Sequence, residues 1–227
     1  MDDSAFIAAL QLTDSFFPSG AVTLSHGLET FLSGQSEAVD LSQLLRDYLE
    51  RKIAPFDLVA YVHAYQAVAE EDIERLHRID RYLNVSLLPQ ELRQGSLRSG
   101  RGTLETLRRV VEEPLFQTFL AGVNAGKSNG HLPICLAILH SLWRIPRRRG
   151  GCMLLYAFMV NFLSAAIRLG CLGHREAQGL LIHFRPQVTP LVERALDSPL
   201  EEIGAFVPLA DIRAMQHAHL SVRLFSS

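Results

Sequence analysis

The segment with the clearest catalytic spacing runs from Ala121 to Ser128 and reads Ala-Gly-Val-Asn-Ala-Gly-Lys-Ser. It fits a permissive phosphate-loop pattern, with Lys127 at the phosphate-binding position and Ala121 in place of the usual first glycine. That chemistry needs a strand before the loop and a helix whose N–H groups face the phosphate. The residues before Ala121 have a helical pattern, and Gly130 and Pro133 interrupt any helix soon after Ser128. We expect a loop between helices, with nucleotide binding through Lys127 as an alternative.

Metal binding is the second chemistry to consider, because the chain has nine histidines. The closest groups are His217 with His219, and Cys171 with His174. Side chains two residues apart on a helix point away from each other, so His217 and His219 cannot easily share one ion. Zinc or nickel would need ligands four residues apart or two paired clusters. We expect no stable metal site, with direct nickel binding through His217, His219 or Cys171 as the alternative.

Hydrolytic chemistry and nucleic-acid binding lack their usual signals. Ser25-His26 is a lone adjacent pair and not a catalytic triad. The basic run from Arg147 to Arg149 is short, and a net charge of −2 with a pI near 6.5 gives no basic footprint for nucleic acid. We therefore expect neither a catalytic residue nor a nucleic-acid partner.

The composition predicts a compact intracellular protein. Hydrophobic residues make up 48% and charged residues 20%, which excludes disorder. Cys135, Cys152 and Cys171 form no CxxC pair, as expected in a reducing cytoplasm. The acidic start Met1-Asp2-Asp3 lacks the basic region of a signal peptide. The uncharged stretch from Gly150 to Ile167 is short for a membrane span, so we expect a buried core helix and no membrane association.

Helical periodicity runs along almost the whole chain. Asp40 can cap a helix, Gln43 follows three residues later, and the leucines from Leu41 to Leu49 share one helical face. Pro55 predicts a break, after which Phe56 to Glu71 forms the next helix. Further helices are expected over Glu74–Val85, Thr103–Val111, Pro114–Val123, Pro133–Trp143, His174–Phe184, and from Pro208 onward.

Two regions need a separate interpretation. Pro146 to Gly150 is expected to be a loop before an apolar helix that reaches about Leu169. Between Arg93 and Gly102, three glycines lie among three arginines, so either the helix is interrupted or another segment packs against its backbone. With no alternating strand, linker or repeat, the sequence predicts an all-α single-domain bundle of about ten helices over residues 1–227.

Four segments of the chain share a further likeness. They are Leu12 to Glu29, with Asp14-Ser-Phe-Phe-Pro-Ser-Gly20 and Gly27-Leu-Glu29; Gly130-His-Leu-Pro133; the helix from Tyr156 to Gly170; and the terminus from Met215 to Ser226. Together they resemble the urease accessory protein UreF family, and in order they cover nearly the whole chain.

The resemblance implies a helical protein without catalysis of its own. Such proteins bind the accessory protein UreD (UreH in some species), recruit the GTPase UreG and support nickel delivery to apo-urease. They typically form homodimers and are proposed to modulate the GTPase. The nucleotide site then belongs to the partner, and nickel is handled by the assembled complex while this chain binds no cofactor stably.

The resemblance also places partner contacts at the two ends, in a docking segment over residues 1–20 and a docking helix and tail over residues 208–227. At the N-terminal end the expected contacts are Gln11, Asp14, Ser15, Phe17, Pro18 and Gly20, to which we add Glu29. At the C-terminal end they are Arg213, His217, Leu220, Arg223, Leu224 and Phe225. Leu224 and Phe225 would be exposed apolar anchors with Arg223 as a donor beside them. The alternative is that both fold back onto the core.

Overall fold

The computed structural model describes residues 1–14, 16–33, 39–217 and 224–225. This part of the chain contains helices and no strand, in one domain, which confirms the predicted all-α bundle of about ten helices. The helices are α1 (Asp3–Thr13), α2 (Leu28–Ser33), α3 (Leu41–Tyr48), α4 (Val59–Ala69), α5 (Ile73–Ser86), α6 (Gln90–Leu107), α7 (Pro114–Asn124), α8 (Leu132–Leu142), α9 (Arg147–Arg168), α10 (His174–Asp197) and α11 (Pro208–His217). Short 3-10 turns, η1 (Ala21–Thr23) and η3 (Leu200–Glu202), and a π-helical segment, η2 (Leu49–Leu58), complete the elements.

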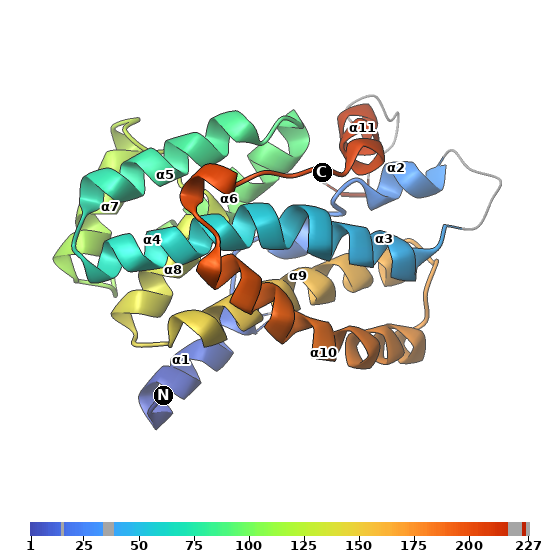
Figure 1. Ribbon diagram of the computed structural model, residues 1–227, viewed down its shortest axis with the longest axis horizontal. Coiled ribbons are helices and arrows are strands. Elements are labelled where there is room, and N and C mark those ends of the chain that lie inside the picture. The colour runs from blue at the N-terminus through green and yellow to red at the C-terminus, as the bar shows by residue number, and fades with distance from the viewer. Residues whose placement is uncertain (15, 34–38, 218–223, 226–227) are drawn as a thin grey trace.

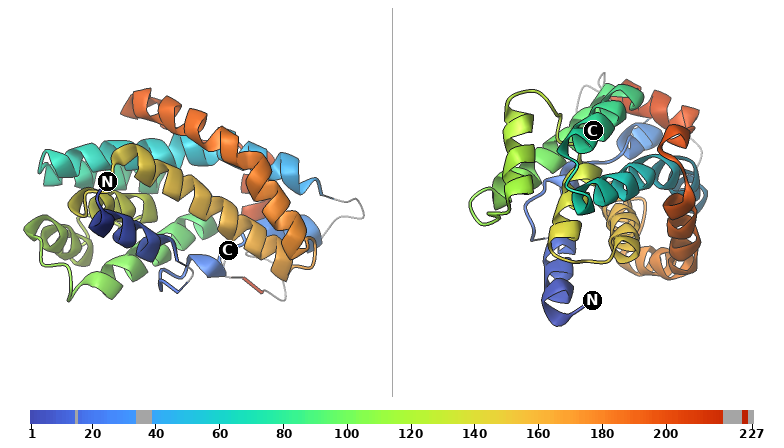
Figure 2. Two further views of the ribbon diagram at one scale, coloured as in Figure 1. Left: turned by 90° about the horizontal axis from the view of Figure 1, so that it is seen from below. Right: turned by 60° about the vertical axis from the view of Figure 1, so that its left-hand side comes forward.

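The core forms where α4, α8 and α9 meet. Helix α4 packs along α8, α8 packs on α6, and α9 pairs with α10 on the other side (Figure 1). The first helix, α1, projects from one edge of the bundle (Figures 1 and 2). Only its inner face is covered, where Ala5 and Ala9 pack against Ile145. The C-terminal helix α11 lies on α2 and α6.

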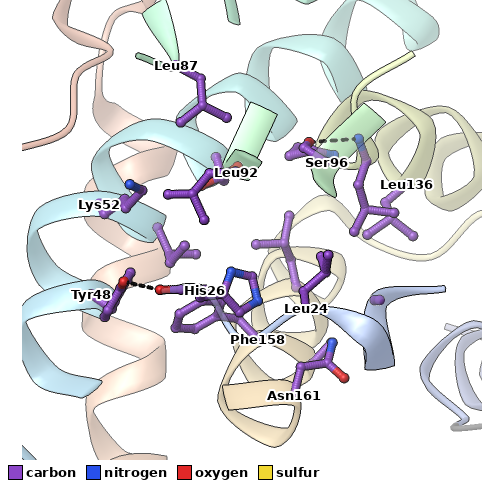
Figure 3. A pocket seen from close by; sticks show the side chains of 17 residues that line it. Leu24, His26, Tyr48, Lys52, Leu87, Leu92, Ser96, Leu136, Phe158 and Asn161 are labelled. Atoms are coloured by element: carbon purple, nitrogen blue, oxygen red, sulfur yellow. Dashed lines mark hydrogen bonds between the residues drawn. The ribbon is translucent and has the colours of Figure 1, made fainter. Parts of the chain in front are cut away.

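The predicted break at Pro55 is wrong. Helices α3 and α4 are joined by η2 into one continuous rod, which begins where predicted because the Asp40 carboxylate accepts the Gln43 N–H at 3.0 Å. A proline lacks the N–H that would bond the carbonyl four residues earlier, here that of Arg51. The N–H of Phe206 donates to the Arg51 carbonyl at 2.9 Å instead. This external donor lets the helix pass through the proline, and η2 also forms one wall of a cavity (Figure 3).

The loop expected over Pro146 to Gly150 is also wrong, because α9 already begins at Arg147. Pro146 precedes the first turn, whose N–H groups need no partner within the helix. Both glycines that follow are inside the helix. A Cβ at Gly150 would collide with the side chains of Tyr61 and His140. Close packing of α9 on α4 and α8 therefore explains why glycines occur here inside a helix, where the sequence predicted a loop.

Helix α10 extends past its predicted end at Phe184 to Asp197, through Pro186 and Pro190. Both prolines are exposed and lie four residues apart, on the outer face of the helix. The carbonyls that lose an N–H partner there are open to water, which lowers the cost of the prolines. The buried side of this stretch, including Val188, holds the helix against α9.

The glycine-rich stretch of α6 is an uninterrupted helix against which another segment packs. A Cβ at Gly100 would collide with the backbone of residues 130–132. A Cβ at Gly102 would lie 3.3 Å from the carbonyl oxygen of Ser19. Of the two alternatives left open by the sequence, close intramolecular packing is the one that the structure supports.

The Gly130-His-Leu-Pro133 segment is held by a buried carboxylate. Asp80 of α5 accepts the N–H groups of Gly130 at 3.0 Å and of His131 at 2.9 Å. These are N–H groups at the start of α8, which favour a negative charge. The His131 ring also contacts the Ser96 hydroxyl of α6 at 3.1 Å. This segment is therefore a junction between α5, α6 and α8.

Helix α9 is long and apolar enough to cross a membrane by length and composition. Its most apolar window is 56% buried inside the protein, and the helix packs against α4, α8 and α10. It serves as the core helix that the sequence predicted.

Candidate partner-docking site at the C-terminal tail

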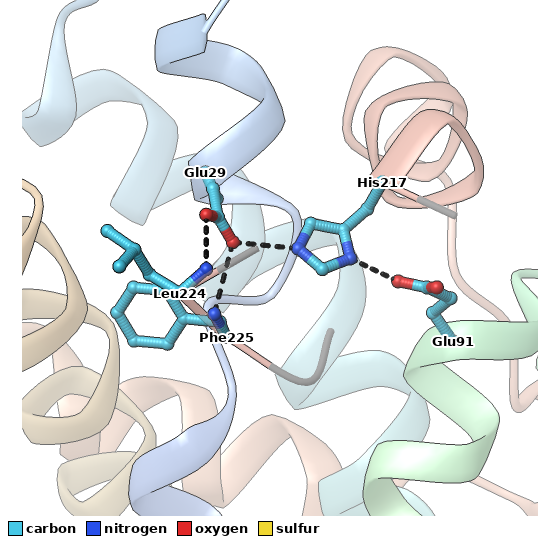
Figure 4. Close-up of polar contacts among 5 residues, drawn as sticks. All are labelled: Glu29, Glu91, His217, Leu224 and Phe225. Atoms are coloured by element: carbon cyan, nitrogen blue, oxygen red, sulfur yellow. Dashed lines mark hydrogen bonds and ion pairs between the residues drawn. The ribbon is translucent and has the colours of Figure 1, made fainter. Parts of the chain in front are cut away.

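A buried histidine joins three helices near the end of the chain (Figure 4). His217, the last residue of α11, has a fully buried side chain. Its Nε2 lies 2.8 Å from a carboxylate oxygen of Glu29 in α2, and its Nδ1 contacts a carboxylate oxygen of Glu91 in α6. The cluster therefore fixes the C-terminal helix to two elements from the first half of the chain.

Each hydrogen bond of this cluster needs a proton on either the His217 ring nitrogen or the carboxyl oxygen. Carboxylates only accept hydrogen bonds, so each ring nitrogen of His217 must donate one, unless a carboxyl group carries the proton itself. An imidazolium between Glu29 and Glu91 satisfies both contacts with charge-assisted hydrogen bonds. In this arrangement neither ring nitrogen offers a lone pair to a metal ion.

The Glu29 carboxylate also holds the tail. One oxygen accepts the Leu224 N–H at 2.7 Å, and the other accepts the Phe225 N–H at 3.2 Å (Figure 4). Burial of the Glu29 carboxyl opposes its charge, but hydrogen bonds from Leu224, His217 and Phe225 outweigh that effect and keep its pKa below the usual value. A single charged group therefore orders a segment 195 residues away.

The two tail residues face in different directions. The Phe225 ring is 5% exposed and packs on the core beneath the guanidinium of Arg168, 4.3 Å from the ring centroid. Leu224 is 71% exposed. The expectation of two exposed anchors therefore holds for Leu224 alone, while Phe225 folds back onto the core and orients its neighbour.

The Gly27-Leu-Glu29 motif shows why these three residues occur together. Gly27 has φ +80°, and a Cβ there would lie 3.1 Å from the backbone nitrogen of Ala214 in α11. Only glycine allows this close approach without strain. Leu28 is fully buried in the core. The motif thus brings α2 against α11 and directs the Glu29 carboxylate to His217.

Helix α11 has an apolar face that the protein leaves uncovered. Leu209, Ile212 and Met215, three residues apart, are 56%, 51% and 46% exposed. Such spacing keeps them on one side of the helix. Arg213 lies on another side, where its guanidinium is 5.9 Å from the Phe31 ring centroid, so it packs within the chain. The outer face of α11 and Leu224 are therefore exposed apolar groups of the same C-terminal region.

The predicted N-terminal residues form a turn with a second exposed apolar region. The Asp14 carboxylate accepts the Phe16 N–H at 2.7 Å, and Gly20 has φ +75°. Phe16 is 93% exposed, whereas Phe17 is half-buried. A shallow groove there is lined by Ile7, Leu10, Gln11, Asp14, Phe16, Phe17, Pro18, Thr106 and Leu107. The structure therefore gathers Gln11, Asp14, Phe17 and Pro18 on one surface.

Helix α6 connects the two regions. Glu91 in its first turn contacts His217, and Gly102, eleven residues later, packs against the Pro18-Ser19 turn. At 1.5 Å per residue, these positions are about 16 Å apart along the helix. The N-terminal groove and the C-terminal cluster are thus separate surfaces on one rigid support.

Some predicted residues lie outside the described part of the chain. They are Ser15, Leu220 and Arg223 among the expected partner contacts, and His219 among the candidate metal ligands.

The residues of the phosphate-loop pattern form the end of helix α7 and the loop after it. Residues 121–124 belong to α7, and the Lys127 N–H donates to the Gly122 carbonyl at 2.8 Å. The Ser128 hydroxyl is buried against His77 Nδ1 at 2.6 Å. This confirms the predicted inter-helix loop, because a phosphate cradle needs a preceding strand and free N–H groups. Among the residues that the structure describes, no three His, Cys, Asp or Glu side chains are grouped to hold a metal ion.

Three residues of this site had no clear signal in the sequence. Glu91 follows Pro89 in an ordinary first helical turn, Arg168 ends an apolar helix, and Ala214 is one of many alanines. Each matters through a contact with a distant segment, which periodicity and capping rules do not reveal. An acidic residue paired across the chain with a buried histidine would be visible only once the fold is known.

Comparison with known proteins gives one consistent family. The UreF family model matches residues 36–185. A urease accessory protein UreF of Trichodesmium erythraeum is 32% identical over 231 aligned residues, covering 100% of this chain and 98% of that protein. UreF proteins of Actinobacillus pleuropneumoniae and Yersinia enterocolitica are 29% identical over 97% and 100% of this chain. The family match spans most of the chain, and the relatives align over the N-terminal groove, α6 and the Glu29–His217 cluster alike. This chain belongs to the UreF family of urease accessory proteins.

Proposed function

We propose that this chain is a non-catalytic scaffold for urease maturation. It binds UreD (UreH), recruits the GTPase UreG and modulates it, and so supports nickel insertion into apo-urease. It acts as a homodimer in the cytoplasm, without nucleic acid or membrane. Nickel is handled by the assembled complex, and this chain holds no cofactor stably.

The observation that carries the proposal is the tail held by Glu29. A carboxylate with three contacts, to His217 and to the Leu224 and Phe225 N–H groups, fixes the backbone of residues 224–225 and leaves Leu224 exposed. Ordering a chain end costs conformational entropy, and an ordered exposed leucine gains nothing for the isolated fold. A partner surface that covers Leu224 would use this arrangement, because an ordered apolar anchor costs less to bind. We assign UreD to this surface.

The N-terminal groove supports a second contact. Phe6, Ile7 and Leu10 on α1 and Phe16 in the turn are all at least half exposed. Exposed apolar side chains gathered in one region of a soluble protein mark a site for partner contact. We assign this groove to the same partner assembly, with Gln11 and Asp14 supplying polar contacts at its edge.

Co-expression with UreD, UreG and urease tests the proposal. The unaltered chain is expected to co-purify with UreD and to activate urease. Truncation after Leu220 should abolish co-purification while the helical circular dichroism spectrum is retained. Because truncation also removes the buried Phe225, Leu224→Asp provides a second variant that keeps the core contact. Ile182→Asp on α10, where Ile182 is 61% exposed, is the matched control. Full UreD binding by both C-terminal variants would overturn the assignment.

A further inference from the structure

A cavity in the interior has a composition that the docking surfaces do not explain. It occupies about 120 Å³ between η2, α6, α8, α9 and the segment after η1 (Figure 3). Most of its wall is aliphatic or aromatic, with Leu24, Ile53, Leu92, Leu136 and Phe158 among the lining residues. A dry cavity of similar size lined by such side chains binds a single benzene ring. Volume and lining therefore fit a ligand of one ring or a short chain.

One side of the cavity is polar. Lys52 is buried there, and its ammonium group pairs with Asp211 of α11. Asp57 lines the cavity one helical turn farther along η2. Asp57 is half-buried. Burial raises the pKa of Asp57 to about 7, with the Lys52 charge acting in the opposite direction.

His26 faces the same space. The centroids of the His26 and Phe158 rings are 4.9 Å apart, in an edge-to-face contact. The His26 ring lines the cavity, as Lys52 does (Figure 3). Burial, with the nearby Lys52 charge, lowers its pKa to about 4, so at neutral pH the ring has one donor and one acceptor nitrogen. Within the described residues, neither this ring nor the Asp57 carboxyl hydrogen-bonds another side chain.

The backbone on both sides of this polar wall is unusual. His26 has φ +55°, which is uncommon for a residue other than glycine, and the wall that carries Lys52 and Asp57 is π-helical. Strained residues and π-helical segments both cluster at binding sites, where the fold maintains them despite their cost. Here they bring the His26 ring and the Asp57 carboxyl, whose hydrogen bond is to its own backbone, to the edge of an otherwise apolar cavity.

The charged and polar groups that line the cavity indicate which chemical class of ligand fits it. A charged head group would lose its hydration in an apolar cavity, and the one full positive charge, on Lys52, is already paired with Asp211. A purely apolar ligand would offer no hydrogen bond to the His26 ring and none to the Asp57 carboxyl beyond that of its own backbone. A hydroxyl or carboxamide group can donate to one of them and accept from the other. We propose that this cavity is a binding site for a small neutral amphiphile, one apolar ring or short chain with a hydroxyl or carboxamide head placed between Asp57 and His26.

Binding of benzyl alcohol to the purified full chain tests the proposal, with toluene, benzylamine and benzoate as comparisons. Leucine-methyl NMR spectra would follow the cavity directly, since many of its lining side chains are leucines. We expect saturable shifts of those methyl groups by benzyl alcohol, with a dissociation constant on the order of 0.1–1 mM for a ligand of this size. Toluene, benzylamine and benzoate should each bind at least about threefold more weakly.

Single substitutions test whether the ligand binds inside this cavity. Ala157→Leu fills the cavity and should remove the shifts, whereas Gly179→Leu adds the same side chain at an exposed helical position with open space around it and should leave them unchanged. Asp57→Leu should reduce the preference for benzyl alcohol over toluene. If Ala157→Leu does not fold, Leu136→Phe serves the same purpose. The proposal is overturned by absent or non-saturable shifts, by unchanged binding to the filled variant, or by equal binding of a charged or purely apolar probe.

Discussion

At the scale of single residues, Glu29 is the group on which the C-terminal arrangement depends. Its carboxylate contacts His217 and both described tail N–H groups, so it joins α2, α11 and the tail. Glu29 belongs to one sequence motif and His217 to another. Nothing in the residues between them indicates that the two side chains meet across 188 positions.

Glu29→Gln should weaken the cluster, because hydrogen bonds to a charged acceptor contribute more than those to a neutral one. We predict a loss of about 1.5–3 kcal/mol in the free energy of unfolding, measured by urea titration at pH 7. Glu105→Gln is the control, since that exposed carboxylate pairs with Arg108 at the surface. Equal stability losses in the two variants would show that Glu29 has no special role.

The same variant has a defined pH dependence. The pKa of Glu29 is lower in the folded protein than in the unfolded chain. Its stabilisation is therefore fully present above the unfolded pKa and is lost as pH falls through the folded pKa. The difference in unfolding free energy between the unaltered protein and Glu29→Gln should shrink below about pH 4.3, the ordinary range of a glutamate. A difference that grows on acidification would contradict this account.

Asp57 should show the opposite dependence. Burial raises its pKa to about 7, so the folded protein binds this proton more tightly than the unfolded chain. The associated stability is present at low pH and is lost as pH rises from about 4 to 7. Relative to Asp57→Asn, the unaltered protein should lose stability across that interval, as followed by thermal melts at a series of pH values. Parallel curves for the two proteins would exclude a buried, protonated Asp57.

At the scale of elements, local signals predicted some helix starts correctly but predicted interruptions poorly. Asp40 caps α3 and Pro208 opens α11, as the sequence predicted. The errors at Pro55 and Pro186 share a cause, since each proline is tolerated through something outside its own turn. At Pro55 it is the N–H of Phe206, and at Pro186 it is exposure to water. Tertiary contacts of this kind cannot be inferred from spacing.

Glycines inside helices provide a matched test of helix packing. Gly100 in α6 lies against the backbone of residues 130–132, whereas Gly179 in α10 has open space around it. Alanine has the better helix propensity by about 1 kcal/mol, so Gly179→Ala should raise stability by up to that amount. Gly100→Ala should instead lower it by about 1–3 kcal/mol, because α6 must move away from α8. Urea unfolding of both variants checks the prediction, and the same sign for both would refute the close packing.

At the scale of the whole molecule, a chain with 48% hydrophobic residues exposes apolar side chains at two places. One lies around Phe16, and the other is the C-terminal region, where Leu224 and the outer face of α11 are exposed. The all-α fold could be predicted from periodicity, and the family motifs indicated the two ends of the chain as candidate sites. Which side chains are exposed at these two ends could not be predicted from the sequence. Phe16 faces outward rather than Phe17, and Leu224 rather than Phe225.

These surfaces predict how the isolated chain behaves. We expect it to self-associate in a concentration-dependent way, and to become more soluble when UreD is co-expressed. Sedimentation velocity of Phe16→Asp and Leu224→Asp should show less association than the unaltered chain, with Ile182→Asp as the control. If Ile182→Asp reduces association as much as the other two, the effect reflects added charge rather than these surfaces.

If the tail held by Glu29 presents Leu224 to UreD, the dissociation constant of the complex with UreD depends on that one side chain. An apolar anchor replaced by aspartate should cost at least about 2 kcal/mol, which is about 30-fold in affinity. We therefore predict that Leu224→Asp weakens UreD binding by about 30-fold or more in a biosensor titration, while Ile182→Asp binds like the unaltered chain. Equal affinity of Leu224→Asp and Ile182→Asp for UreD would contradict the account.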